Sequence, residues 1–144
     1  MLKGGSGVRP DTALPAMNDE RELVFVYGTL RAGASNHFRM AGAEFVGKAW
    51  VRGMLFRVDW YPGLVIDEEA RPVRGELYRV PPELLAALDD FEGAAGRTDD
   101  EFVRVYAKVD STGSSEGLSA WVWEYRGPCA GLDSVPNDDW LECE

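Results

Sequence analysis

The hydrophobic positions of the chain fall mostly in short runs that have the length and spacing of β-strands. The run "LVFVY" (23–27) is continuously apolar, which predicts a central strand covered on both faces. The run "FVRVYAKV" (102–109) alternates instead, which predicts a half-buried antiparallel strand. "LSAWVWEY" (118–125) is expected to pair with it across the polar segment 111–117, whose composition suits a hairpin loop. Further strands are predicted at 44–50, 53–58, 64–66 and 74–80.

Glycine and proline residues mark the predicted breaks between these strands. Gly53 predicts a bend or bulge between two of them. Tyr61-Pro62-Gly63 predicts a turn, and "DEEARP" (67–72) predicts a second one.

One helix is strongly indicated. "PPELLAALDDFEG" places leucines and a phenylalanine on one face, with proline at its start and Gly93 at the position after its end, which predicts a helix over about 82–91. A weaker helix is predicted over "SNHFRMAG" (35–42). Mostly antiparallel strands with one or two helices predict an α+β domain built on a strongly curled sheet or a small barrel.

Length and composition indicate one domain without a membrane span. Of the 144 residues, we expect 1–21 to form a flexible lead-in that lacks the apolar core of a secretory signal, and 22–144 to form a single domain. The net charge of −10 and the lack of a basic cluster argue against a nucleic-acid partner. Cys129 and Cys143 have neither disulfide-scaffold nor metal-site spacing, so we predict a cytoplasmic protein without a metal site.

The first candidate site follows the first strand directly. Gly28 permits a sharp change of direction, and the backbone N–H groups of Gly28, Thr29 and Leu30 can converge on an anion such as a substrate carboxylate. The alternative is a turn without a ligand, which the spacing alone favours. The loop matches neither a Walker sequence nor a dinucleotide-binding fingerprint.

The second candidate is Glu92, at the end of the predicted helix. The negative end of the helix dipole raises the pKa of a carboxylate placed there, and a general base near neutral pH requires such a raised pKa. The alternative, favoured by the charge pattern alone, is a solvated acidic helix end that includes Asp89 and Asp90. His37, the sole histidine, and most of the tryptophans are assigned to structure.

Several motifs together resemble the gamma-glutamylcyclotransferase-like family. They are "VFVYGTLRAG", "FVGKAWVRGMLFRV", "YPGLV", "VRGELYRV" and "LDDFEG", in this order over about residues 23–126, and "SVPNDDW" is similar to a C-terminal element of that family. The resemblance implies a compact mixed, mostly antiparallel β-barrel with one or two flanking helices. It also implies a pocket beside the Tyr-Gly-Thr-Leu loop.

The resemblance further implies an enzyme that cyclises a small-molecule gamma-glutamyl amine or peptide to 5-oxoproline and releases the free amine, without a metal or cofactor. The loop of Tyr27, Gly28, Thr29, Leu30 and Arg31 would bind the glutamyl head group. Glu92 would be the general acid/base. Two alternatives stay open: a hydrolase or transferase acting on gamma-glutamyl amides, and a non-catalytic module that binds a small molecule or a protein partner.

The chain departs from the family pattern in ways that bear on substrate choice. Trp123 stands where the family has a tyrosine, which removes a hydroxyl that could bind substrate. A longer polar insert, "AAGRTDDE" (94–101), lies near the expected pocket rim. Glu76, in "RGELY", is a second carboxylate in a family element and is assigned a structural or supporting role. The identity of the amine and the oligomeric state stay open.

Overall fold

The computed structural model describes residues 20–92, 101–111 and 114–142. The predicted lead-in therefore lies outside the described residues except for Glu20 and Arg21. Gly93 and residues 94–100 of the predicted insert also lie outside the described residues, whereas Glu101 lies within them.

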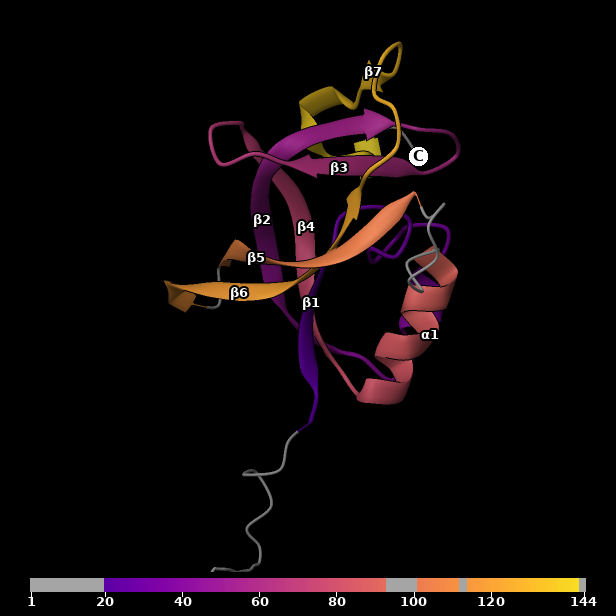
Figure 1. The fold of residues 1–144 in the computed structure, drawn as a ribbon. Coiled ribbons are helices and arrows are strands. Elements are labelled where there is room, and N and C mark those ends of the chain that lie inside the picture. The colour runs from indigo at the N-terminus through magenta and orange to yellow at the C-terminus, as the bar shows by residue number, and fades with distance from the viewer. Residues whose placement is uncertain (1–19, 93–100, 112–113, 143–144) are drawn as a thin grey trace, which may run out of the picture.

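Five strands close into a barrel (Figure 1). In spatial order they are β2 (Glu44–Arg57), β4 (Pro72–Val80), β1 (Glu22–Val26), β6 (Ser114–Tyr125) and β5 (Phe102–Ser111). All neighbouring pairs are antiparallel except β1 and β6, which are parallel where Val24 lies beside Trp121. β5 pairs back with β2 through Ala49 and Trp50, and this pairing closes the sheet. The predicted α+β fold with a mixed, mostly antiparallel barrel is thus confirmed.

Two short strands pair with the C-terminal part of β2. β3 (Pro62–Ile66) pairs with it along one edge, and β7 (Asp133–Ser134) pairs with it along the other. Short 3-10 helices complete the described chain at His37–Met40, Pro136–Asp138 and Trp140–Glu142. No helix among the described residues is long and apolar enough to cross a membrane.

The helix α1 (Pro82–Glu92) covers the outer face of β1 and β4. Its buried residues Leu85 and Leu88 pack in one cluster with Val24 and Val26 of β1. Phe25, between those two valines, instead belongs to the cluster inside the barrel. β1 is therefore buried on both faces, as its continuous apolar sequence predicts, and its C-terminal end is fixed from two sides.

Two predicted strand boundaries are wrong. The predicted strands 44–50 and 53–58 form a single strand, because Trp50, Val51 and Arg52 continue the pairing with β4. The irregularity of this strand lies between Phe45 and Gly47 rather than at Gly53. Gly53 is a site of close approach, since a Cβ there would lie 2.5 Å from the Val65 carbonyl oxygen.

Other predicted elements shift by a few residues. Pro62 and Gly63 belong to β3, and the turn precedes them, with the Tyr61 carbonyl accepting hydrogen bonds from Val58 and Asp59. The predicted helix over 35–42 is a 3-10 helix at His37–Met40. β5 and β6 extend into the predicted 111–117 loop and leave only residues 112–113 between them, outside the described residues.

Candidate active site

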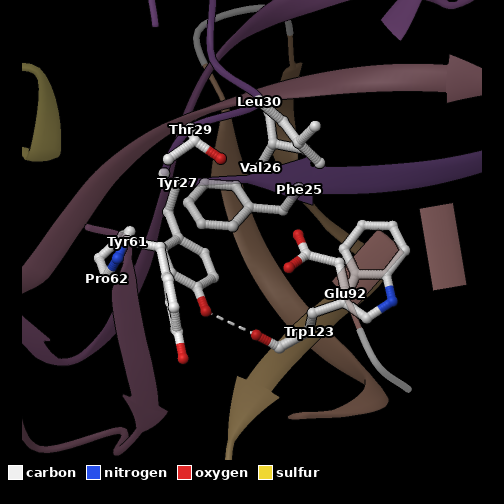
Figure 2. A pocket seen from close by; sticks show the side chains of 10 residues that line it. Phe25, Val26, Tyr27, Thr29, Leu30, Tyr61, Pro62, Glu92 and Trp123 are labelled. Carbon is white, nitrogen blue, oxygen red and sulfur yellow. Dashed lines mark hydrogen bonds between the residues drawn. The ribbon is translucent and has the colours of Figure 1, made fainter. Parts of the chain in front are cut away.

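A small pocket with a cavity volume of about 30 Å³ lies where the end of β1 meets the end of α1. Figure 2 shows the Glu92 carboxylate pointing into this inner pocket, between the ring of Tyr27 and the indole of Trp123. Of the residues predicted to form a site, Tyr27, Gly28, Thr29, Leu30 and Glu92 line this pocket, whereas Arg31 does not. Its remaining lining residues are Phe25, Val26, Tyr61, Pro62 and Trp123.

The loop after β1 is a tight turn with unused donors. The Gly28 carbonyl accepts a hydrogen bond from the Arg31 N–H at 3.1 Å, and the Leu30 carbonyl accepts one from His37 Nδ1 at 2.9 Å. Within the described part of the chain, the N–H groups of Gly28, Thr29 and Leu30 have no hydrogen-bond acceptor. Because buried N–H groups are nearly always paired in folded proteins, these three donors are suited to bind an anionic ligand.

The lack of a side chain at residue 28 is required by a close approach. A Cβ on Gly28 would lie 2.7 Å from Cγ of Pro62, which is closer than any real contact. Positive φ angles occur at other glycines, such as Gly33, but not at Gly28. Pro62 of β3 therefore packs directly on the turn.

Tyr27 lines the inner pocket with its ring, while its hydroxyl is occupied. The hydroxyl donates a hydrogen bond to the Trp123 carbonyl at 2.7 Å and accepts one from the Leu64 N–H at 3.2 Å. The side chain thereby joins β3 to β6 beside the site.

Glu92 has the raised pKa that a base near neutral pH requires. The half-buried carboxyl has its pKa raised from 4.5 to about 7, mainly because burial removes it from water and also because Asp89 lies one turn earlier on the same helix. The position of Glu92 at a helix end predicts a raised pKa through the helix dipole, whereas burial is the main cause in the structure.

Asp89, which the sequence pattern assigns to a solvated acidic helix end, supports the site beside Glu92. Its Oδ1 atom accepts a hydrogen bond from Trp123 Nε1 at 2.8 Å and forms an ion pair with Arg104 Nε at 3.0 Å. Trp123, interpreted from sequence as the loss of a hydroxyl, also holds this carboxylate in place. The i, i+3 spacing to Glu92 was the available signal, because residues so spaced share a helix face.

Arg31 lies in a buried polar cluster away from the pocket lining. Its side chain pairs with Asp139 at 2.6 Å and with Glu76 at 3.3 Å. Glu76 also accepts hydrogen bonds from the Ala32 N–H at 2.9 Å and from the Tyr78 hydroxyl at 3.1 Å. Arg31 and Glu76 thus fasten the turn to β4 and to the C-terminal segment.

A second, outer pocket with a cavity volume of about 180 Å³ adjoins the first. It shares Thr29, Tyr61 and Glu92 with the inner pocket, and sequence analysis did not identify it. Among the described residues, no group of three or more His, Cys, Asp or Glu side chains is placed to hold a metal ion. The further residues that line the outer pocket are Trp60, Phe91, Glu101 and Phe102.

The fold is a small mixed barrel in which Glu92 and a glycine-containing turn line one pocket. Comparison with known protein families shows the class of protein to which this fold belongs. Residues 24–142 match the family model described as "Gamma-glutamyl cyclotransferase, AIG2-like". The chain belongs to this family, and the resemblance seen in the sequence motifs is confirmed.

The relatives include bacterial proteins of similar length. The "Gamma-glutamylcyclotransferase family protein YtfP" of Escherichia coli K12 is 31% identical over 120 residues, which cover 83% of this chain and 96% of the relative. The "Gamma-L-glutamyl-butirosin B gamma-glutamyl cyclotransferase" of Niallia circulans is 33% identical over 123 residues, covering 83% of this chain and 70% of the relative. The crystal structure of a mouse AIG2-like protein has a TM-score of 0.72 and 23% identity, covering 84% of this chain and 88% of the mouse chain.

Proposed function

We propose that the protein is a gamma-glutamylcyclotransferase that converts a gamma-glutamyl amine or peptide to 5-oxoproline and a free amine. The observation that carries the proposal is one pocket lined both by Glu92, with a pKa of about 7, and by Gly28, Thr29 and Leu30, whose backbone N–H groups have no acceptor in the described chain. The relative from Niallia circulans, whose name gives such an activity on gamma-L-glutamyl-butirosin B, supports the reaction class.

The loop amides bind and orient the substrate in this proposal. The N–H groups of Gly28, Thr29 and Leu30 bind the alpha-carboxylate, and the ring of Tyr27 forms the wall of the inner pocket. Holding the head group this way folds the gamma-glutamyl chain so that its alpha-amine approaches its own gamma-carbonyl carbon. Such orientation is itself a large source of rate acceleration, because an intramolecular attack needs only the correct geometry.

Glu92 moves the protons. Its carboxylate takes a proton from the alpha-ammonium group, and the freed amine attacks the gamma-carbonyl carbon to form the ring C–N bond. The carboxylic acid then gives this proton to the leaving nitrogen as the original amide C–N bond breaks. The regenerated carboxylate removes the second proton from the ring nitrogen, which gives the neutral lactam, and passes that proton to the released amine, which leaves as an ammonium ion. A pKa of about 7 suits these steps, because both protonation states are well populated near neutral pH.

Arg31 has a different role from the other loop residues in this proposal. Its side chain is 4% exposed and already paired with two carboxylates, so we assign it to holding the turn rather than to contacting substrate. The cytoplasmic location predicted from the cysteines stays a prediction.

Product analysis tests the proposal directly. The purified protein is incubated with a panel of gamma-glutamyl amines and peptides, and 5-oxoproline and glutamate are measured by mass spectrometry. We expect 5-oxoproline, and we expect Glu92→Gln to lower kcat by about 10²–10⁴-fold. Glu83→Gln, an exposed carboxylate on the same helix, is the matched control and keeps the wild-type rate.

Each alternative function predicts a different product. Glutamate in place of 5-oxoproline would identify a hydrolase. Binding of a gamma-glutamyl amine without turnover, unchanged in Glu92→Gln, would identify a binding module. Product release by Glu92→Gln at the wild-type rate would remove Glu92 from the mechanism.

A further inference from the structure

The outer pocket lies on the side of Glu92 where a leaving group has to pass. The inner pocket receives the glutamyl head group in the proposed reaction, and Glu92, Thr29 and Tyr61 form the boundary between the two pockets. The leaving nitrogen must be within reach of Glu92 to receive its proton. The rest of the amine then extends into the outer pocket.

The walls of the outer pocket are aromatic. The ring of Tyr61 packs against Trp60 at a centroid distance of 5.0 Å and against Phe102 at 5.9 Å. Trp60 is 57% exposed, so a large indole surface is available to a ligand. Aromatic faces attract cations as well as apolar groups, and tryptophan does so most strongly.

The charges around the outer pocket are negative. Glu101 lines it and accepts a hydrogen bond from the Tyr61 hydroxyl at 2.5 Å, which fixes one carboxylate oxygen. The other oxygen has no hydrogen-bond donor within the described part of the chain and can face a ligand. Asp59 lies near enough to contribute to raising the pKa of the Tyr61 hydroxyl. Among the described residues that line this pocket, none is Lys, Arg or His. Arg39 stacks on the Phe91 ring at 4.1 Å, but it does not belong to the lining.

We propose that the outer pocket selects a leaving amine that carries a second positive charge, such as an alkyl diamine, through Glu101 and the indole of Trp60. This inference rests on the proposed cyclotransferase activity and names its substrate class. Amines that end in a carboxylate are disfavoured, because Glu101 would face a like charge.

Three substrates that differ only at the far end of the amine test the proposal. They are the gamma-glutamyl derivatives of 1,4-diaminobutane, of pentylamine and of 4-aminobutyrate, whose ends are an ammonium, a methyl group and a carboxylate. We expect kcat/KM for 5-oxoproline formation to be about fivefold higher for the diamine derivative than for the pentylamine derivative, the size typical of a partly exposed ion pair with a cation–π contact. The carboxylate derivative is expected to be the poorest substrate.

Variants distinguish the effect of the outer pocket from general effects of the protein's net charge. Glu101→Gln keeps an acceptor for the Tyr61 hydroxyl but removes the charge, and we expect it to lower the diamine-to-pentylamine ratio to about twofold or less. Trp60→Leu keeps apolar area without the π face and is expected to lower the ratio as well. Glu69→Gln, an exposed carboxylate in the turn between β3 and β4, changes the net charge equally and should leave the ratio at its wild-type value.

Binding measurements keep this inference distinct from the proposed activity. Isothermal titration calorimetry with the same three compounds reports the subsite even when no 5-oxoproline forms. Tighter binding of the diamine derivative, reduced in Glu101→Gln, would support the subsite whether or not turnover occurs. Equal Kd values for the diamine and pentylamine derivatives, or a ratio of kcat/KM that Glu101→Gln leaves unchanged, would overturn the proposal.

Discussion

Nη1 of Arg31 lies 2.6 Å from Oδ1 of Asp139, and this pair joins two residues that are 108 positions apart in the chain. Asp139 Oδ1 also accepts a hydrogen bond from the Leu141 N–H at 3.1 Å, so the carboxylate is itself fixed by the last 3-10 helix. The turn that lines the inner pocket is therefore anchored by the C-terminal segment. Its amide groups are held in place by contacts that do not involve the pocket.

Removal of the Arg31 side chain should destabilise the protein strongly. Arg31→Met leaves the buried Glu76 carboxylate without its cation and leaves Asp139 with only the more distant Arg74 at 4.0 Å. Removing one partner of a buried ion pair typically costs about 3–5 kcal/mol in free energy of unfolding. Urea denaturation monitored by tryptophan fluorescence measures the loss. Arg71→Met is the control, because Arg71 pairs with Asp138 while its side chain is 80% exposed, and its loss should cost less than about 1 kcal/mol. Equal small losses for both variants would show that the Arg31 cluster is not an anchor.

Glu92→Gln should make the protein more stable at alkaline pH while removing its activity. The pKa of Glu92 is about 7 in the folded protein and 4.5 when exposed, so the folded state binds the proton more tightly. The stability that this proton provides is complete below about pH 4.5 and is lost as the pH rises through 7. Glutamine stays neutral, so we expect a gain of about 3 kcal/mol in free energy of unfolding at pH 8 and none at pH 4. Urea denaturation at both pH values checks this, and a gain of the same size at both would contradict it.

The activity of the protein should depend on the ionisation of Glu92. The base form grows as the pH rises through about 7, so kcat/KM is expected to fall below that pH. Asp89→Asn removes a negative charge that raises this pKa, and its amide oxygen can still accept the Trp123 hydrogen bond. The acidic limb of the pH profile should therefore shift to lower pH. Asp90→Asn, an exposed neighbour on the same helix, should leave the limb in place, and a shift in both variants would remove the specific role of Asp89.

The sequence predicts those parts of the site that depend on local pattern. Glu92 could be placed because helix spacing and a following glycine locate the end of α1, and the turn after β1 because an apolar run ends at Gly28. The partners of Arg31 could not be predicted from the sequence, because Asp139 is 108 positions away and lies beside Arg31 only in the folded chain. Glu101 next to Tyr61 is a similar case, since the two lie 40 positions apart. Such contacts depend on which strands pair, and local patterns do not encode that.

The joining of two predicted strands into the single strand β2 also depends on which strands pair. Buried positions alternate without a break through Gly53, and the strand continues in its pairing with β3. The glycine is required because a Cβ there would lie 2.5 Å from the Val65 carbonyl oxygen. A glycine in a strand can mark a bulge or a close approach, and only the neighbouring strand decides between them.

Gly28→Ala should impair catalysis because it displaces the turn. The added Cβ would lie 2.7 Å from Cγ and 2.9 Å from Cδ of Pro62, so the turn or the proline ring must move. A displacement of about 1 Å in a positioning group can cost about 100-fold in rate, and we expect a fall of about 10- to 100-fold in kcat/KM. Pro62→Ala in the same chain removes the ring and should recover part of the loss, measured as a double-mutant cycle with both single variants. Wild-type kcat/KM in Gly28→Ala, or a double variant no better than Gly28→Ala alone, would show that this contact does not set the position of the turn.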